Sequence, residues 1–277
     1  MSALTRPRSL RPARQTAAVA AIALAGAALA GCSSSSSGGS AASGSASGSS
    51  QALSGGITVF AASSLQKTFT ALANTFEKEH PGTTVKFSFG GSDTLAAQIT
   101  QGAPADVFAA ASQSTMETVE KAGDTTGTPT VFVKNTLEIA VEPGNPKDIK
   151  TLADLTKSGI KVAECAATVP CGSAAVKALA AAKVKLTPVT YETDVTSALT
   201  KVELGEVDAA LVYHSDILGA DGKVEGVVFS TASDAVNSYP IDVLKGSTNA
   251  SLAQAFVTYI LSPSSEQYLL KAGFQAP

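Results

Sequence analysis

The sequence predicts an α/β protein with two lobes, each built on a sheet that helices cover on both faces. From Ile57 onward, short runs of β-branched or aromatic residues alternate with segments whose apolar residues recur at helical spacing. An extended run from Thr130 to Val141 is long enough to cross between two lobes, and a second run near Asp234 to Leu244 offers a return. With 277 residues, 44% of them hydrophobic, the chain can bury a core of this size.

The first lobe is predicted from a strand, helix, strand pattern that begins at Ile57. Leu65, Phe69, Leu72 and Phe76 mark one face of the first helix, which His80-Pro81-Gly82 ends. Gly90-Gly91-Ser92 turns the second strand into the second helix, which Gly102 and Pro104 end. The expected strands are 57–61, 83–89 and 106–109, and the expected helices are 64–79, one through Leu95 and Ile99, and 112–121.

A second set of the same kind follows the crossing. We expect strands near 160–164, 207–213 and 226–230, helices near 173–182 and 194–203, and terminal helices at 250–261 and 265–271. The lobes are then 56–137 plus 236–277, and 138–235. Two lobes joined by two crossings would place a ligand in the cleft between them.

Charge is distributed unevenly along the chain. All four arginines lie in the first 14 residues, and beyond residue 31 sixteen lysines stand against 23 acidic residues, a net charge of −7. Electrostatic binding to nucleic acid is therefore not expected. Any anion that this part of the chain holds is bound without a guanidinium fork.

The N-terminus resembles a bacterial lipoprotein signal peptide. A basic region is followed by an apolar run and then by Leu29-Ala30-Gly31-Cys32. The resemblance implies removal of residues 1–31, lipidation of Cys32 and attachment to the outer face of the cell membrane. Residues 32–55 are expected to form a flexible tether, because 33–50 contain only Ser, Gly and Ala.

Two cysteines remain once Cys32 is assigned to lipid. Cys165 and Cys171 are separated by five residues, and an even pair outside the cytoplasm predicts a disulfide. A metal site is disfavoured, because His80 and His214 are not at ligand spacing from either cysteine.

Four predicted helix starts could bind an oxyanion through free backbone N–H groups. They are Ala62-Ser63-Ser64, Gly91-Ser92, Pro170-Cys171-Gly172-Ser173 and Thr193-Asp194-Val195. The alternative is that their polar residues are ordinary N-caps. Spacing alone leaves both interpretations open.

The motifs together resemble the molybdate-binding component of a bacterial ABC importer. They occur in that family's order over nearly all of residues 56–277, and Gly102-Ala-Pro-Ala-Asp-Val-Phe108 is the most distinctive of them. The segment's expected role is structural, as a turn that leads into a strand supporting the cleft floor, and Asp106 is not expected to be a ligand. The others that carry the resemblance are Ile57-Thr-Val-Phe-Ala-Ala-Ser-Ser-Leu65, Gly91-Ser-Asp-Thr-Leu95, Val169-Pro-Cys-Gly172, Asp194-Val195 and Leu211-Val-Tyr-His-Ser-Asp216.

The resemblance implies a ligand shell of neutral donors. Ser64 and Ser92 match serines that donate hydroxyl and N–H groups, Cys171 and Val195 match main-chain donors, and Tyr213 matches the tyrosine that closes the shell. Asp93 follows Ser92 where a neutral residue is common, and we expect its carboxylate to point away from the cleft.

The implied protein has the type II periplasmic-binding-protein fold, with a mixed sheet in each lobe and the ligand between the lobes. It would be a non-enzymatic, lipid-anchored monomer that binds molybdate, and tungstate as well, and delivers the anion to an ABC permease. It would need no cofactor, and molybdenum would enter only as the oxyanion.

Other functions remain as alternatives. A receptor for tungstate alone or for sulfate is close in chemistry. Ser64-Leu-Gln-Lys67 matches the S-x-x-K pattern of serine acyl enzymes, but no S-D-N or K-T-G partner occurs. A Cys171/His214 pair would be another nucleophilic candidate, which a disulfide at Cys171 would exclude.

Overall fold

The computed structural model describes residues 52–277, so the predicted signal peptide, Cys32 and most of the predicted tether lie outside the described residues. The described part forms two five-stranded sheets, ordered β2-β1-β3-β10-β4 and β7-β6-β8-β5-β9. Each sheet contains both parallel and antiparallel pairs, which confirms the predicted fold class. No helix within 52–277 combines the length and the apolar character that a membrane span requires.

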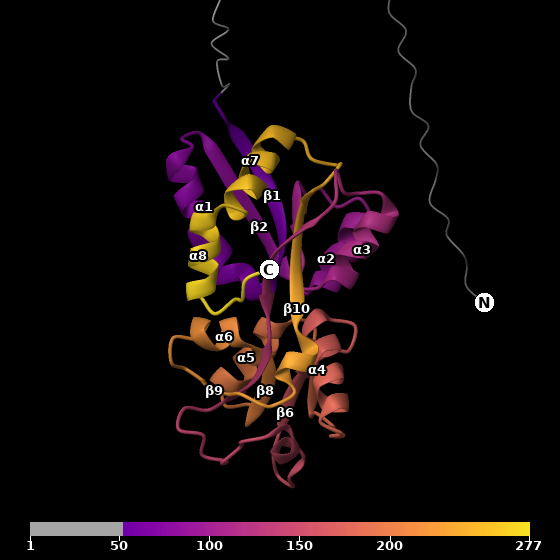
Figure 1. Ribbon diagram of the computed structural model, residues 1–277, viewed down its shortest axis with the longest axis vertical. Helices are drawn as coiled ribbons and strands as arrows, with labels where there is room; N and C mark the ends of the chain where they lie inside the picture. The colour runs from indigo at the N-terminus through magenta and orange to yellow at the C-terminus, as the bar shows by residue number, and fades with distance from the viewer. Residues whose placement is uncertain (1–51) are drawn as a thin grey trace, which may run out of the picture. The chain divides into compact units, whose positions relative to one another are not determined.

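The first sheet is formed by the two ends of the described chain (Figure 1). Strand β1 pairs in parallel with β2 and β3, whereas β10 is antiparallel to β3 and β4. The strands are β1 (Gly55–Ala62), β2 (Thr83–Gly90), β3 (Val107–Ala109), β4 (Thr130–Asn135) and β10 (Asn237–Val243). The helices are η1 (Ser63–Leu65), α1 (Gln66–Glu79), α2 (Ser92–Thr100), α3 (Gln113–Ala122), α7 (Ala250–Ile260) and α8 (Pro263–Lys271).

Alternation along the strands buries both faces of this sheet. Val59 and Val107 belong to the core that α1 and α7 share, whereas Phe60 and Phe108 point to the other face and pack with residues of α2 and α3. Successive side chains of one strand therefore serve two different cores, as expected for a sheet between two helical layers.

The second sheet is contributed by the middle of the chain. Its strands are β5 (Leu137–Val141), β6 (Val162–Cys165), β7 (Thr190–Glu192), β8 (Ala209–Tyr213) and β9 (Glu225–Val227). Its helices are η2 (Leu152–Thr156), α4 (Pro170–Ala181), α5 (Val195–Glu203), α6 (His214–Gly219) and η3 (Ala232–Ala235).

Two segments connect the sheets. The predicted crossing from Thr130 to Val141 is confirmed, since only Thr136 separates β4 of the first sheet from β5 of the second. The second connection, which returns the chain to the first sheet, runs from η3 into β10. Strand β10 pairs with β4, beginning with Asn237 opposite Asn135. The short elements β7, α6, η2 and η3 were not predicted. Helix α4 begins at Pro170, three residues before its predicted start, because proline is well suited to the first helical turn.

Candidate oxyanion site

A small pocket lies where strands of both sheets end. The space inside it, open solvent at its mouth included, is ≈ 190 Å³. Strands β1, β2 and β8 end at Ala62, Gly90 and Tyr213, all of which line it, and the segments that follow β3, β6 and β7 complete the wall. Ligands of open α/β sheets bind at such carboxyl ends. The lining residues are Ala62, Ser63, Ser64, Gly90, Gly91, Ser92, Ala111, Val169, Pro170, Cys171, Asp194, Val195 and Tyr213.

All five residues that the resemblance assigned to the ligand line this pocket. Ser64 and Ser92 come from the first lobe, and Cys171, Val195 and Tyr213 come from the second. The structure therefore brings together residues from positions 64 to 213 of the chain in one place.

The helical segments η1, α2 and α4 start at the pocket without a side-chain cap. The N-cap residues Ala62, Gly91 and Val169 make no capping hydrogen bond through their side chains. By contrast, α3, α7 and α8, whose N-caps do not line the pocket, are each capped by a Ser or Asn side chain. N–H groups of a first helical turn need an acceptor, so the uncapped starts can bind an anion.

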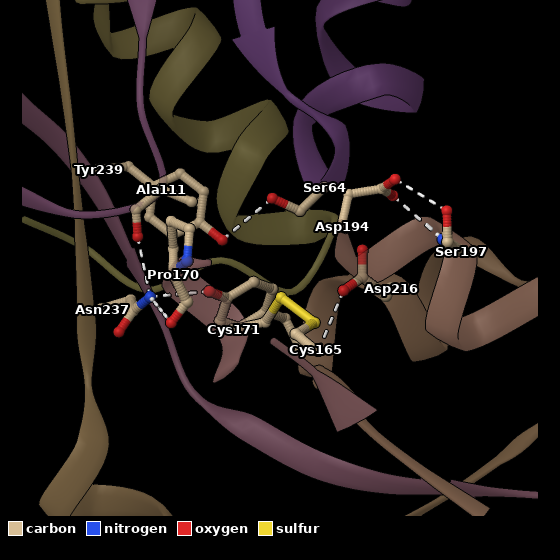
Figure 2. The surroundings of a disulfide bond; sticks show 11 residues. Ser64, Ala111, Cys165, Pro170, Cys171, Asp194, Ser197, Asp216, Asn237 and Tyr239 are labelled. Carbon is tan, nitrogen blue, oxygen red and sulfur yellow. Dashed lines mark hydrogen bonds between the residues drawn. A yellow bond between two sulfur atoms is a disulfide. The ribbon is translucent and has the colours of Figure 1, made fainter. Parts of the chain in front are cut away.

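The alternative that the polar residues at these starts are N-caps holds only for Asp194. Its carboxylate accepts hydrogen bonds from the Ser197 N–H at 3.0 Å and the Ser197 hydroxyl at 2.8 Å (Figure 2). Ser64 and Ser92 lie inside their helical segments and cap neither. Their hydroxyls remain available to a ligand.

The hydroxyl groups of the pocket are held by a buried polar network. Ser92 Oγ accepts a hydrogen bond from the Ala111 N–H at 3.0 Å, and Ser64 Oγ lies 3.0 Å from Tyr239 Oη. Tyr213 Oη lies 2.7 Å from Asn237 Nδ2. Burial raises the pKa of both phenols, and the nearby carboxylate of Asp216 raises it further, so both stay protonated at neutral pH.

A disulfide joins the end of β6 to the start of α4. Cys165 and Cys171 are bonded with an S–S distance of 2.05 Å, and both residues are buried (Figure 2). The sulfur of Cys171 is thereby occupied, and no Cys171/His214 nucleophile exists in this structure. His214 Nδ1 instead lies 2.8 Å from Glu138 Oε1.

The described residues that line the pocket include no lysine, arginine or histidine. Asp194 is the one carboxylate among them, and Ser197 binds it. Asp93 does not line the pocket, and its buried Oδ1 has no hydrogen-bond partner among the described residues. An anion in the pocket would be bound by neutral dipoles.

Asp106 has a structural role, as expected. Its Oδ2 accepts a hydrogen bond from the Thr58 N–H at 2.7 Å, and its Oδ1 accepts from the Ser247 hydroxyl at 2.7 Å and the Thr248 N–H at 2.9 Å. The carboxylate thus ties β1 to the loop after β10, at the amino end of β3.

The S-x-x-K pattern does not pair its two residues. Lys67 Nζ contacts Asp221 Oδ2 at 2.6 Å and donates to Gly219 O at 3.2 Å, whereas Ser64 Oγ lies against Tyr239. The lysine therefore links α1 of the first lobe to the end of α6 in the second, and the structure gives no support to an acyl enzyme.

The Lys67–Asp221 pair should contribute little to anion binding. Their side chains are 60% and 74% exposed, and solvent screens such pairs strongly. We expect Lys67→Ala to change the affinity for an oxyanion by less than about fivefold. Isothermal titration of the variant beside the wild type checks this, and a loss above about thirtyfold would mean that the cation is part of the site.

Asp216, which accepts a hydrogen bond from the N–H of the pocket residue Tyr213, should make stability depend on pH. Burial raises the pKa of this carboxyl to about 7, the Tyr213 N–H opposes the rise, and Asp194 adds to it. The folded protein then binds a proton at a higher pH than the unfolded chain does. The resulting stabilisation is complete below about pH 4 and is lost as the pH rises through about 7.

We therefore expect wild-type Tm to be several degrees higher at pH 5.5 than at pH 8, with a smaller difference in Asp216→Asn. Asparagine keeps the acceptor for the Tyr213 N–H and cannot ionise. Burial also raises the pKa of Glu164 to about 7, so this carboxyl should account for part of the pH dependence of Tm that remains in Asp216→Asn. Glu164→Gln is the matched control that measures this part. Parallel Tm–pH curves for the wild type and Asp216→Asn would contradict the assignment.

Comparison with known proteins places the chain in a class of binding proteins. Residues 57–275 match the family model described as bacterial extracellular solute-binding protein. The molybdate-binding protein ModA of Mycobacterium tuberculosis is 45% identical over 221 residues, which cover 80% of this chain and 85% of the relative. The chain belongs to this solute-binding family, together with the ModA proteins, whose members are transport components and not enzymes.

Solved structures share the fold. The periplasmic molybdate-binding protein of Azotobacter vinelandii is 22% identical with a TM-score of 0.69, and the match covers 80% of this chain and 99% of that one. The sulfate-binding protein SubI of Mycobacterium tuberculosis is 19% identical with a TM-score of 0.70, with coverage of 80% and 86%. At these identities the likeness establishes the fold and not the ligand.

Sequence reasoning missed the residues behind the ligand shell. Tyr239 and Asn237 touch the hydroxyls of Ser64 and Tyr213, and Ala111 supports Ser92. Asn237 and Tyr239 fall in the predicted return crossing, where a polar residue in an extended run was the one available signal.

Proposed function

We propose that this protein captures molybdate outside the cytoplasm and delivers it to an ABC importer. The observation that carries the proposal is the pocket in which the neutral hydroxyls of Ser64, Ser92 and Tyr213 meet the helix starts at Cys171 and Val195, of which only the start at Val195 has a side-chain cap. The kinship with proteins named molybdate-binding protein ModA supports it.

The donor set favours a fully deprotonated oxyanion. Molybdate needs only hydrogen-bond donors, whereas monohydrogen phosphate also needs an acceptor for its proton. Asp194, the one carboxylate in the described lining, already accepts two hydrogen bonds from Ser197. Sulfate has the same charge but shorter bonds, so it would leave donors stretched in a shell that closes around the larger molybdate. Tungstate is nearly isosteric with molybdate and should bind as well.

A sulfate-type receptor is the second candidate, because the sulfate-binding SubI shares this fold. Sulfate too needs no acceptor, so the two functions differ only in the size of the anion that satisfies all donors at once.

Binding would involve closure of the two lobes, 56–137 plus 236–277 and 138–235, about hinges near Asn135 to Ala140 and Asp234 to Tyr239. The pocket draws residues from both lobes, so only the closed arrangement presents all five proposed ligand residues to one anion. ATP hydrolysis belongs to the partner, since the sequence contains no G-x-x-x-x-G-K-[ST] loop. The receptor would act as a monomer.

An uptake assay tests the function in cells. Cells that lack the gene should lose high-affinity uptake of radiolabelled molybdate, and the wild-type gene should restore it. A gene carrying both Ser92→Ala and Tyr213→Phe should not. Undiminished uptake without the gene, or full restoration by the double variant, would contradict the proposal.

The lipid anchor is a separate part of the proposal, supported by the Leu29-Ala30-Gly31-Cys32 box. We expect Cys32→Ser to move the protein from the membrane fraction to the soluble fraction and to abolish labelling by a radioactive fatty acid. Cys165→Ser is the matched control. It also replaces a cysteine by serine, but Cys165 is bonded to Cys171, so the substitution should leave the fatty-acid labelling intact. Fatty-acid labelling that persists in Cys32→Ser would refute the anchor.

A further inference from the structure

Asn237, the first residue of β10, contacts both lobes beside the pocket (Figure 2). Its side-chain nitrogen lies 2.8 Å from Ala111 O, 3.2 Å from Pro170 O and 2.7 Å from Tyr213 Oη. Ala111 belongs to the first lobe, whereas Pro170 and Tyr213 belong to the second. Asn237 is only 7% exposed, so these contacts are made out of water.

The two carbonyl groups fix the orientation of the Asn237 amide. A carbonyl oxygen can only accept, so the amide atom that faces Ala111 O and Pro170 O has to be the NH₂ group. The reversed amide would place an oxygen against two other oxygens. The same NH₂ group faces the phenol of Tyr213 at 2.7 Å. Its two protons serve three oxygen atoms, so the two shorter contacts, to Ala111 O and Tyr213 Oη, each take one proton and Pro170 O at 3.2 Å shares one of them. The phenol oxygen is therefore the acceptor of its hydrogen bond with Asn237.

This contact determines what the phenol can offer to a ligand. With its oxygen accepting from Asn237, Tyr213 still has its own proton to donate, either to the neighbouring Tyr239 hydroxyl or to an anion in the pocket. Ser92 is fixed in the same way, because its oxygen accepts from the N–H of Ala111, the residue whose carbonyl binds Asn237.

We propose that Asn237 is a positioning residue that holds the Tyr213 phenol as a donor towards the pocket and so favours deprotonated oxyanions over protonated ones. The inference rests on the proposed function. A monohydrogen phosphate ion would need an acceptor for its own proton, and a phenol oxygen already bound by Asn237 is a poor one. Molybdate carries no proton at neutral pH, so it needs no acceptor and its binding is not weakened in this way.

A double-mutant cycle tests whether Asn237 acts through Tyr213. Molybdate binding is titrated calorimetrically in the full-length wild type, Asn237→Ala, Tyr213→Phe and the double variant. We expect each single change to weaken binding roughly tenfold or more, and the double variant to bind within about threefold of Tyr213→Phe. Losses that multiply would overturn the inference, because they would show that Asn237 supports the site by packing alone.

A second variant removes the donor with little change of side-chain shape. In Asn237→Leu, no side chain at position 237 donates to the phenol oxygen, which can then accept a proton from a ligand. At pH 8 molybdate and phosphate are both dianions, and the substitution adds no charge that would act on either. We expect the ratio of molybdate to phosphate affinity to fall by roughly tenfold or more. An unchanged ratio would overturn the inference.

The outcomes separate the inference from the function on which it rests. A wild type that binds no molybdate refutes the function. A wild type that binds, with Tyr213→Phe weakened and Asn237→Ala unaffected, refutes the inference alone. Thermal unfolding of every variant accompanies the titrations, and loss of cooperative unfolding in both Asn237 variants would also refute it, since the residue would then be structural.

Discussion

Gly91→Ala should lower the affinity for molybdate roughly 10- to 100-fold while both lobes remain folded. A Cβ at Gly91 would lie 2.3 Å from Thr193 O and 2.8 Å from Asp93 Oδ1. Thr193 belongs to the second lobe and immediately precedes Asp194 of the pocket wall, so the closer of the two clashes lies between the lobes. Gly91 has φ −62° and ψ 130°, angles that alanine adopts readily, so the substitution adds no backbone strain of its own.

Gly127→Ala is the matched control, because a Cβ there would meet nothing within 4 Å. Titration calorimetry gives the affinities, and small-angle scattering with molybdate reports whether each variant becomes more compact. The account predicts that Gly127→Ala closes like the wild type and Gly91→Ala does not. Wild-type affinity in Gly91→Ala would mean that the described approach of the lobes is not the binding arrangement.

Removing one hydroxyl from the shell should have an effect of similar size. Ser92→Ala and Tyr213→Phe each delete a donor to a bound dianion, and hydrogen bonds to charged groups contribute about 1.5–3 kcal/mol. We expect each variant to bind molybdate roughly 10- to 100-fold more weakly. Both side chains are about 1% exposed, so water cannot readily replace the lost donor.

Tyr191→Phe controls for the loss of a phenol hydroxyl, because Tyr191 is 62% exposed and does not line the pocket. Its affinity should equal that of the wild type. Near-wild-type affinity in both Ser92→Ala and Tyr213→Phe would count heavily against the proposed shell.

Much of the fold could be predicted because its signals are local. Strand β1 and helix α1 begin and end within two residues of their predicted limits, since an apolar run, a helical period and a Pro-Gly stop all lie within 26 residues. Helix α6 and strand β7 were not predicted, because they have six and three residues, too few to show a hydrophobic period. The pairing of β10 with β3 and β4 depends on tertiary contacts that no local pattern encodes.

The candidate site, like the fold, could be predicted from the sequence only in part. Ser64, Ser92, Cys171, Val195 and Tyr213 were predicted through motifs, and the structure gathers them in one pocket. The positioning contacts were not predicted, because each joins distant positions: Ser64 to Tyr239 over 175 residues, and Asn237 to Ala111 over 126. A lone asparagine in a strand gives no sign of the partner that it will meet.

The most direct test of the account is isothermal titration of the full-length protein with molybdate, tungstate, sulfate and phosphate at neutral pH. The neutral donor shell predicts tight one-to-one binding of molybdate and tungstate and no comparable binding of the other two. Sulfate or phosphate bound as tightly as molybdate, or no binding of any of the four, would contradict the central claim that this pocket selects a large, fully deprotonated oxyanion.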